Sequence, residues 1–160
     1  MKEKILAVLE KNSRIDVHDL AVLLGEDEVE VANAIMELEA ENTICGYHTL
    51  INWENTSVEK VQALIEVRVT PQRGMGFDKI AERIYNYPEV NACFLMSGGY
   101  DLMVMLEGKT MREVATFVSE KLSTLDQVLS TATHFVLKKY KDHGTVFADR
   151  KKDERIPVSS

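Results

Sequence analysis

The 160-residue sequence is poor in cysteine and has neither a long apolar run nor the motif of a common enzyme class. Its two cysteines, Cys45 and Cys93, form no CxxC pair, which argues against a disulfide framework or a structural zinc site. No apolar stretch approaches the roughly 20 residues of a membrane-spanning helix. Residues 1–12 are too charged for a signal peptide, so we expect a cytoplasmic protein without membrane contact.

Motifs for catalysis and metal binding are also missing. The sequence contains no HExxH, GxSxG or GxxxxGK pattern, and its histidines are scattered at positions 18, 48, 134 and 143. We therefore expect no enzyme, no metal site and no cofactor.

Basic residues are scarce in the N-terminal third. Residues 1–57 carry four Lys or Arg and twelve Asp or Glu, whereas residues 58–160 carry fifteen and fourteen. The net charge of −7 therefore comes from the N-terminal third, and residues 26–41 contain no Lys or Arg at all. Basic side chains that remain for contacts with an anionic partner are Lys2, Lys4, Lys11, Arg14 and the tail cluster Arg150–Lys152.

Apolar spacing in the first 53 residues predicts three short helices, over 2–12, 16–24 and 27–42. Asp16 is a plausible N-cap of the second helix, and Gly25 ends it. Residues 44–53 alternate enough to predict a two-stranded wing. Together these elements predict a winged helix-turn-helix over 1–53, with a bare three-helix bundle as the alternative.

After a polar linker at 54–60, the pattern changes to βαββαβ over 61–140. We expect strands at 61–70, 90–96, 101–107 and 127–137, and a turn at 71–76. One helix carries an apolar stripe over 77–84, and Thr110 with Glu113 forms a capping box for the other. The fold class is thus α+β, a winged helix-turn-helix followed by a ferredoxin-like domain, with 141–160 as a C-terminal tail.

The strand at 102–106, LMVML, is apolar on both of its faces. Two helices on one face of the sheet would leave its other apolar face exposed to water. A second copy packed against that face removes the exposure, so we expect a homodimer that assembles further into tetramers or octamers.

A polar glycine turn joins the second and third expected strands, with the sequence Ser97-Gly98-Gly99-Tyr100-Asp101. Adjacent glycines leave backbone amides uncovered, and these suit a carboxylate, while the Asp101 side chain can receive an ammonium group. The turn is therefore either a plain hairpin or the binding site of a small zwitterion.

Three short motifs in this order resemble the Lrp/AsnC family of transcription regulators. Residues 12–15 (NSRI) look like the family's link between its first two helices, and residues 44–47 (ICGY) look like its entry to the wing. Residues 97–101 match its S/T-G-x-Y/F-D turn, and the resemblance covers residues 5–140.

The resemblance implies that the third helix binds DNA and that the second domain binds an amino acid or related metabolite, in a pocket between dimers. Carried onto this chain, the DNA-contacting positions are Asp27, Glu30, Asn33, Ala34, Glu37 and Tyr47. The effector-binding positions are Ser97, Gly98, Gly99, Tyr100, Asp101, Thr131, Thr133 and His134.

The acidic third helix departs from the arginine-bearing helix of the family. DNA affinity depends largely on cations that neutralise phosphates, so a helix of this charge is repelled by the duplex. Asn33 can still read adenine. Two alternatives to a DNA-binding regulator therefore stay open: an amino-acid sensor that has lost DNA binding and acts through protein contacts, and a tetrapyrrole decarboxylase-like enzyme.

Overall fold

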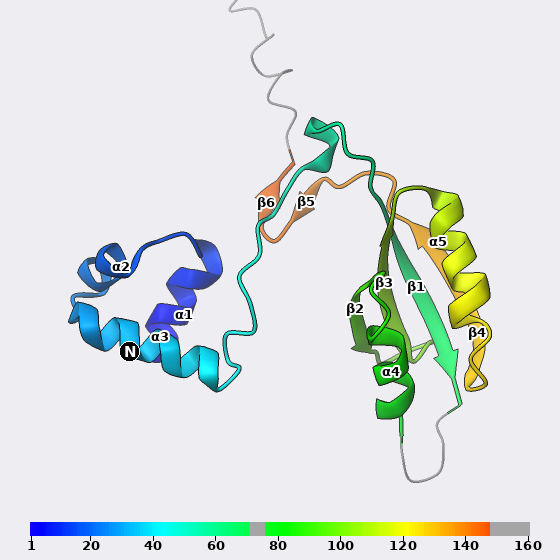
Figure 1. Cartoon of the computed structure of the whole chain (residues 1–160), viewed down its shortest axis with the longest axis horizontal. Helices are drawn as coiled ribbons and strands as arrows, with labels where there is room; N and C mark the ends of the chain where they lie inside the picture. The colour runs from blue at the N-terminus through cyan, green and yellow to red at the C-terminus, as the bar shows by residue number, and fades with distance from the viewer. Residues whose placement is uncertain (71–75, 148–160) are drawn as a thin grey trace, which may run out of the picture. The chain divides into compact units, whose positions relative to one another are not determined.

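A computed structural model describes residues 1–70 and 76–147, and it divides the chain into two compact units between Ile51 and Asn52 (Figure 1). Most of the turn expected at 71–76 and the whole tail cluster Arg150–Lys152 lie outside the described residues. The two units are considered separately below.

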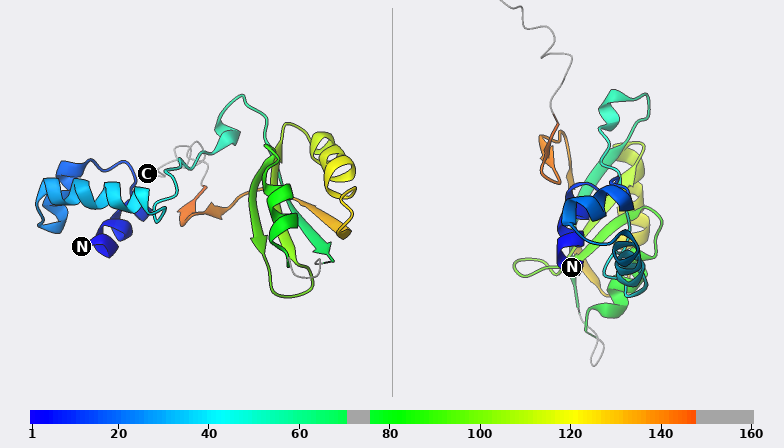
Figure 2. Two further views of the ribbon diagram at one scale, coloured as in Figure 1. Left: turned by 60° about the horizontal axis from the view of Figure 1, so that its bottom comes forward. Right: turned by 90° about the vertical axis from the view of Figure 1, so that its left-hand side faces the viewer.

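The first unit contains three helices, α1 (Lys2–Lys11), α2 (Val17–Leu24) and α3 (Glu28–Ala40), in the order of a helix-turn-helix (Figures 1 and 2). Asp16 caps α2 by accepting a hydrogen bond from the Asp19 amide at 2.7 Å. Gly25 ends α2 in the left-handed region, at φ 68°. The helices bury one small apolar core, made of Ile5, Leu20, Ala21, Val31, Ala34 and Leu38.

The two-stranded wing expected at 44–53 is not present. Residues 45–52 form no regular secondary structure and most of their side chains are exposed; a short 3-10 turn, Trp53–Asn55, follows. α3 ends instead in a compact cap, where the amides of Thr43 and Ile44 both donate to the Leu38 carbonyl, at 2.9 and 3.0 Å. The alternation in this segment has no second strand to pair with, and an isolated hairpin gains little stability in water.

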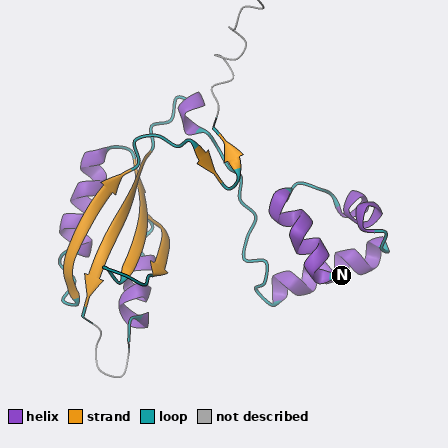
Figure 3. Ribbon diagram, turned by 180° about the vertical axis from the view of Figure 1, so that it is seen from behind, coloured by secondary structure: helices purple, strands orange, loops and turns teal. Residues whose placement is uncertain are grey.

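The second unit is the expected ferredoxin-like sandwich. Its strands are β1 (Val61–Val69), β2 (Val90–Leu95), β3 (Leu102–Gly108) and β4 (Val128–Phe135), in the antiparallel order β2-β3-β1-β4. The helices are α4 (Asp78–Tyr85) and α5 (Met111–Phe117), and α5 continues into a π-helical turn, Val118–Leu122. Figure 3 shows the sheet from behind, with its strands in front of both helices.

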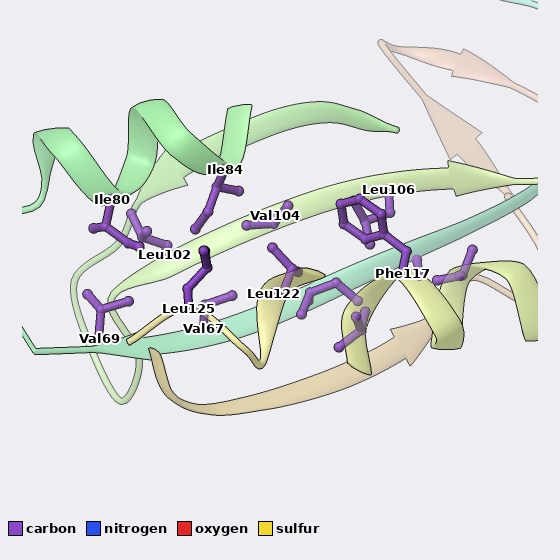
Figure 4. Close-up of a cluster of buried hydrophobic side chains, with 14 residues drawn as sticks. Val67, Val69, Ile80, Ile84, Leu102, Val104, Leu106, Phe117, Leu122 and Leu125 are labelled. Atoms are coloured by element: carbon purple, nitrogen blue, oxygen red, sulfur yellow. The ribbon is translucent and has the colours of Figure 1, made fainter. Parts of the chain in front are cut away.

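Both helices cover the same face of this sheet. Alternate residues of β1 and β3, such as Val67 and Val104, are fully buried beneath them (Figure 4). Helix residues Ile84 and Leu122 enter the same cluster from above the sheet. The intervening strand residues therefore lie on the other face, which no described helix covers.

The stretch that we expected to be a tail begins with a hairpin. Strands β5 (Lys141–Asp142) and β6 (Thr145–Val146) pair across His143 and Gly144, which have φ of 46° and 75°. Positive φ at both central residues is the geometry of a type I′ turn, the tightest hairpin connection. None of the helices in the described residues is long and apolar enough to cross a membrane.

Candidate functional site

Two hydrogen bonds of Asp101 fasten the glycine turn at 97–101 to the end of β1, and a third closes the turn. The Asp101 amide donates to the Val67 carbonyl at 3.1 Å, and the Val69 amide donates to a carboxylate oxygen of Asp101 at 2.9 Å. The Met96 amide donates to the Asp101 carbonyl at 2.8 Å, which closes the turn. Asp101 is therefore a structural latch, and one of its carboxylate oxygens is already engaged.

The tip of the turn is open. Gly98 has φ 119°, which an L side chain rarely adopts, and no atom lies within 4 Å of where a Cβ would stand on Gly98 or Gly99. Ser97 is exposed and Tyr100 is half-buried. The turn thus presents backbone with no side chain of its own at two successive positions, next to a carboxylate that β1 holds in place.

The three candidate residues of β4 do not form one cluster with each other. Thr131 pairs with Val67 and Thr133 with Ile65, so both threonines lie on the face that the helices cover. The Thr131 hydroxyl lies 3.4 Å from that of Ser123, just after the π-helical turn. Thr131 occupies the same rung of the sheet as Leu102, at the end of the sheet where the glycine turn lies.

His134 lies on the opposite, open face of the sheet. It pairs with Leu64 in the register, and its Nε2 is 2.9 Å from a carboxylate oxygen of Glu66 on β1. The register places His134 three rungs from the turn. The register therefore places Thr131 at the same end of the sheet as the turn, with β1 between them, and places His134 three rungs away.

The open face of the sheet carries a stripe of apolar side chains. Ala92, Met105 and Leu64 align across three strands, and Phe94 aligns with Met103 on the next rung. Phe94 is 50% exposed, whereas Leu102, Val104 and Leu106 on the helix side are buried. This confirms that the strand at 102–106 is apolar on both faces, and the Glu66–His134 pair borders the apolar side chains on the β4 side.

In the first unit, the start of α3 is occupied by its own carboxylates. Asp27 caps the helix by accepting from the amides of Val29 and Glu30, at 2.9 and 3.1 Å. These are amides that a helix N-terminus otherwise offers to a phosphate. Asp27 thus acts as a cap, and Glu28 and Glu30 add two further negative charges in the first turn.

The remaining candidate positions of α3 divide into exposed and buried ones. Asn33 is exposed, whereas Ala34 is only 4% exposed and packs in the core of the unit. Because the Ala34 side chain does not reach the surface, we remove it from the interface. Glu37 is exposed but forms an ion pair of 3.0 Å with Lys2 of α1.

Lys2 and Tyr47 both contact the acidic residues of α3. Lys2 also lies 3.3 Å from Glu41, and the hydrogen bond to Glu37 raises the pKa of Lys2. The Tyr47 hydroxyl donates to Glu39 at 2.8 Å; burial, followed by this bond, raises the Tyr47 pKa. Lys2, one of the four Lys or Arg side chains of residues 1–57, is therefore already paired with carboxylates of its own unit.

Sequence reasoning missed one contact of this unit and the partners of the turn. His18 of α2 lies 3.0 Å from Glu28 of α3, and this hydrogen bond raises the His18 pKa. The partners of the turn are the Val67 carbonyl and the Val69 amide, and the sequence does not indicate them because they are backbone groups. In the described residues, no group of three His, Cys, Asp or Glu side chains is placed to hold a metal ion.

Residues 62–146 match the family model for the Lrp/AsnC ligand binding domain. The whole chain is 50% identical over 157 residues to YugG of Bacillus subtilis (strain 168), an uncharacterized HTH-type transcriptional regulator; the match covers 98% of this chain and 95% of that protein. A proline dehydrogenase transcriptional activator of Rhodobacter capsulatus is 28% identical over 134 residues, 84% of this chain and 86% of its own.

Solved structures agree with this result. A transcriptional regulator of Neisseria meningitidis in complex with L-methionine superimposes with a TM-score of 0.70 at 25% identity, over 88% of this chain and 90% of that one. The AsnC protein of Escherichia coli has the same fold, with a TM-score of 0.65 over 86% of this chain and 91% of that one, at 17% identity. The fold and these matches define an HTH-type transcription regulator. The chain belongs to the Lrp/AsnC family.

Proposed function

We propose that this protein binds DNA through α3 of its helix-turn-helix, and that an amino acid bound at the Ser97–Asp101 turn modulates this binding. The observation that carries the proposal is the latch at Asp101, where one carboxylate oxygen accepts from the Val69 amide, two residues after the open glycine backbone. A carboxylate beside uncovered amides offers one partner to each charged group of a zwitterion.

An amino acid is the effector class that the relatives favour. The Neisseria meningitidis regulator binds L-methionine, and two relatives activate a proline dehydrogenase gene. Titration calorimetry with L-methionine, L-proline and other amino acids, each beside its 2-keto acid, tests the proposal. The amino acids should bind more tightly than the keto acids, because only they carry the ammonium group that Asp101 receives.

Thr131 is the one candidate of β4 that we retain beside the turn, because it shares the rung of Leu102. Thr133 and His134 lie further along the strand, and His134 is paired with Glu66. We therefore propose Ser97 to Asp101 and Thr131 as the effector-binding set. Replacing His134 with Gln should leave the effector affinity unchanged in the same calorimetric titration.

For DNA contact we propose Asn33 as the base-reading residue and the exposed face of α3 as the surface that enters the major groove. Since α3 carries no Lys or Arg, each unit neutralises few phosphates, and useful affinity requires several units on one DNA. Anisotropy titrations of a labelled duplex from the region upstream of the protein's own coding sequence, at low and moderate salt, test this proposal.

We also propose a homodimer through the open face of the sheet, and its further assembly into tetramers or octamers, in the cytoplasm. The apolar stripe of Leu64, Phe94, Met103 and Met105 supports this interface, because a monomer would expose it to water. Light scattering of the full chain gives the mass. A monomer at micromolar concentration would contradict the proposal.

A second candidate function is a sensor that has lost DNA binding and acts through protein contacts. It is favoured by α3 itself, where Val29 and Met36 are each 65% exposed on the same side of the helix as Asn33. Absence of binding to any duplex at low salt, with every effector tested, would select this function. We propose no catalytic activity, including that of a tetrapyrrole decarboxylase.

A further inference from the structure

The charge of this chain is distributed in three blocks, and only the last is positive. Residues 136–160 carry seven Lys or Arg and four Asp or Glu, whereas residues 58–135 carry eight and ten. The acidic block, residues 1–57, contains the helix-turn-helix. A protein that must approach DNA with this unit therefore has its only cationic stretch at the other end of the chain.

Part of this positive stretch has a defined structure, which we call the basic arm: residues 136–147, with the β5–β6 hairpin at its end. The Phe147 amide donates to the Tyr140 carbonyl at 2.9 Å, and this bond extends the pairing of the hairpin. Together with the type I′ turn at His143 and Gly144, the bond fixes the backbone of the arm over residues 140–147.

The lysines of the arm differ in what they contact. Lys139 forms an ion pair with Asp142 at 3.4 Å, and His143 contacts the same carboxylate at 2.9 Å. Lys138 and Lys141 are exposed and have no ion-pair partner within the described residues. Lys138 lies over the ring of Tyr140, 5.1 Å from its centroid, and Tyr140 is 73% exposed.

We propose that the basic arm is a second DNA-binding element, in which Lys138 and Lys141 contact backbone phosphates. This inference rests on the proposed function, because it requires that the protein binds DNA. The arm supplies cations that α3 lacks, and the contact of Lys138 with the Tyr140 ring limits the positions of one of them. Its contribution is independent of base sequence, because phosphates carry no sequence information.

The test compares three full-length double variants with the wild type in anisotropy titrations over a range of salt concentrations. K138Q/K141Q removes the two arm charges, and K138R/K141R keeps them. K79Q/R83Q is the matched control, because it removes two exposed charges from α4 and changes the net charge equally. The probes are the upstream duplex and an unrelated duplex of the same length.

We expect K138Q/K141Q to lower the slope of log affinity against log salt by about 0.9 for each lost contact, and the affinity at 0.1 M salt by roughly tenfold per contact. Both duplexes should lose affinity by the same factor. K138R/K141R should bind like the wild type, and K79Q/R83Q should keep the wild-type slope.

Two outcomes would overturn the inference while the wild type still binds DNA. In the first, K138Q/K141Q and K79Q/R83Q show the same slope and affinity. In the second, K138Q/K141Q changes the mass in light scattering, which would make the arm an interface between copies. If the wild type binds neither duplex, the proposed function itself fails.

Discussion

Replacing Asp101 separates its observed role as the latch of the turn from its proposed role as the partner of the effector. Asp101→Asn keeps a side-chain oxygen that can accept from the Val69 amide, but removes the negative charge. Asp101→Ala removes both. Comparing the two variants therefore assigns stability to the hydrogen bond and effector affinity to the charge.

The structure sets the expected magnitudes. A hydrogen bond to a charged acceptor contributes about 1.5–3 kcal/mol, and since Asp101 is only partly buried we expect the lower end for Asp101→Ala. Asp101→Asn should lose less than about 1 kcal/mol of unfolding free energy, because the neutral bond replaces the charged one. Urea denaturation, followed by circular dichroism, measures both.

Effector binding should follow the charge. Losing the carboxylate that receives an ammonium group costs about 1.5–3 kcal/mol, or roughly 10- to 150-fold in affinity, and Asp101→Asn should show this loss in calorimetry. The matching 2-keto acid lacks the ammonium group, so its affinity should be the same for the wild type and for Asp101→Asn.

The reasoning is refuted if Asp101→Asn binds the amino acid as tightly as the wild type, since the carboxylate then has no part in recognition. A loss of equal size for the amino acid and the keto acid would show that the variant changes the turn rather than the charge. If Asp101→Ala is as stable as the wild type, the bond to Val69 does not hold the turn.

Three further predictions concern the other surfaces. Met105→Glu, which places a charge in the centre of the apolar stripe, should convert the assembly to monomers in light scattering; an unchanged mass would exclude this face as the interface. Asn33→Arg should tighten DNA binding by about 1 kcal/mol, roughly fivefold, for each new phosphate contact, and unchanged affinity would place α3 away from the duplex. The contact of His18 with Glu28 raises the His18 pKa, so it stabilises the first unit fully below about pH 6.5 and is lost as the pH rises through the raised value. In an NMR titration Glu28→Gln should bring this pKa back toward its ordinary range, and no change would assign the shift to another cause.

Local patterns in the sequence were sufficient for most of the fold. The apolar spacing of α1 to α3, the cap at Asp16 and the strand alternation of β1 and β3 each depend on neighbours within one or two turns, which a sequence displays directly. The same is true of the acidic surface of α3 and of the glycines in the turn at 97–101. The missed hairpin at 141–146 has a local signal as well, because Gly144 permits the left-handed turn.

Features that depend on pairing between segments far apart in the sequence were determined only by the tertiary structure. The wing needed a second strand, and among the described residues no strand pairs with residues 45–52. The register of β1 with β4 placed Thr131 on the covered face and His134 on the open one, a difference that alternation predicts only once the partner strand is known. The bond from the Val69 amide to Asp101 joins residues 32 apart, and a backbone amide has no signature in a sequence. The polar groups of the turn could therefore be predicted from its own residues, whereas the hydrogen bonds that hold the turn in place come from the neighbouring strand β1.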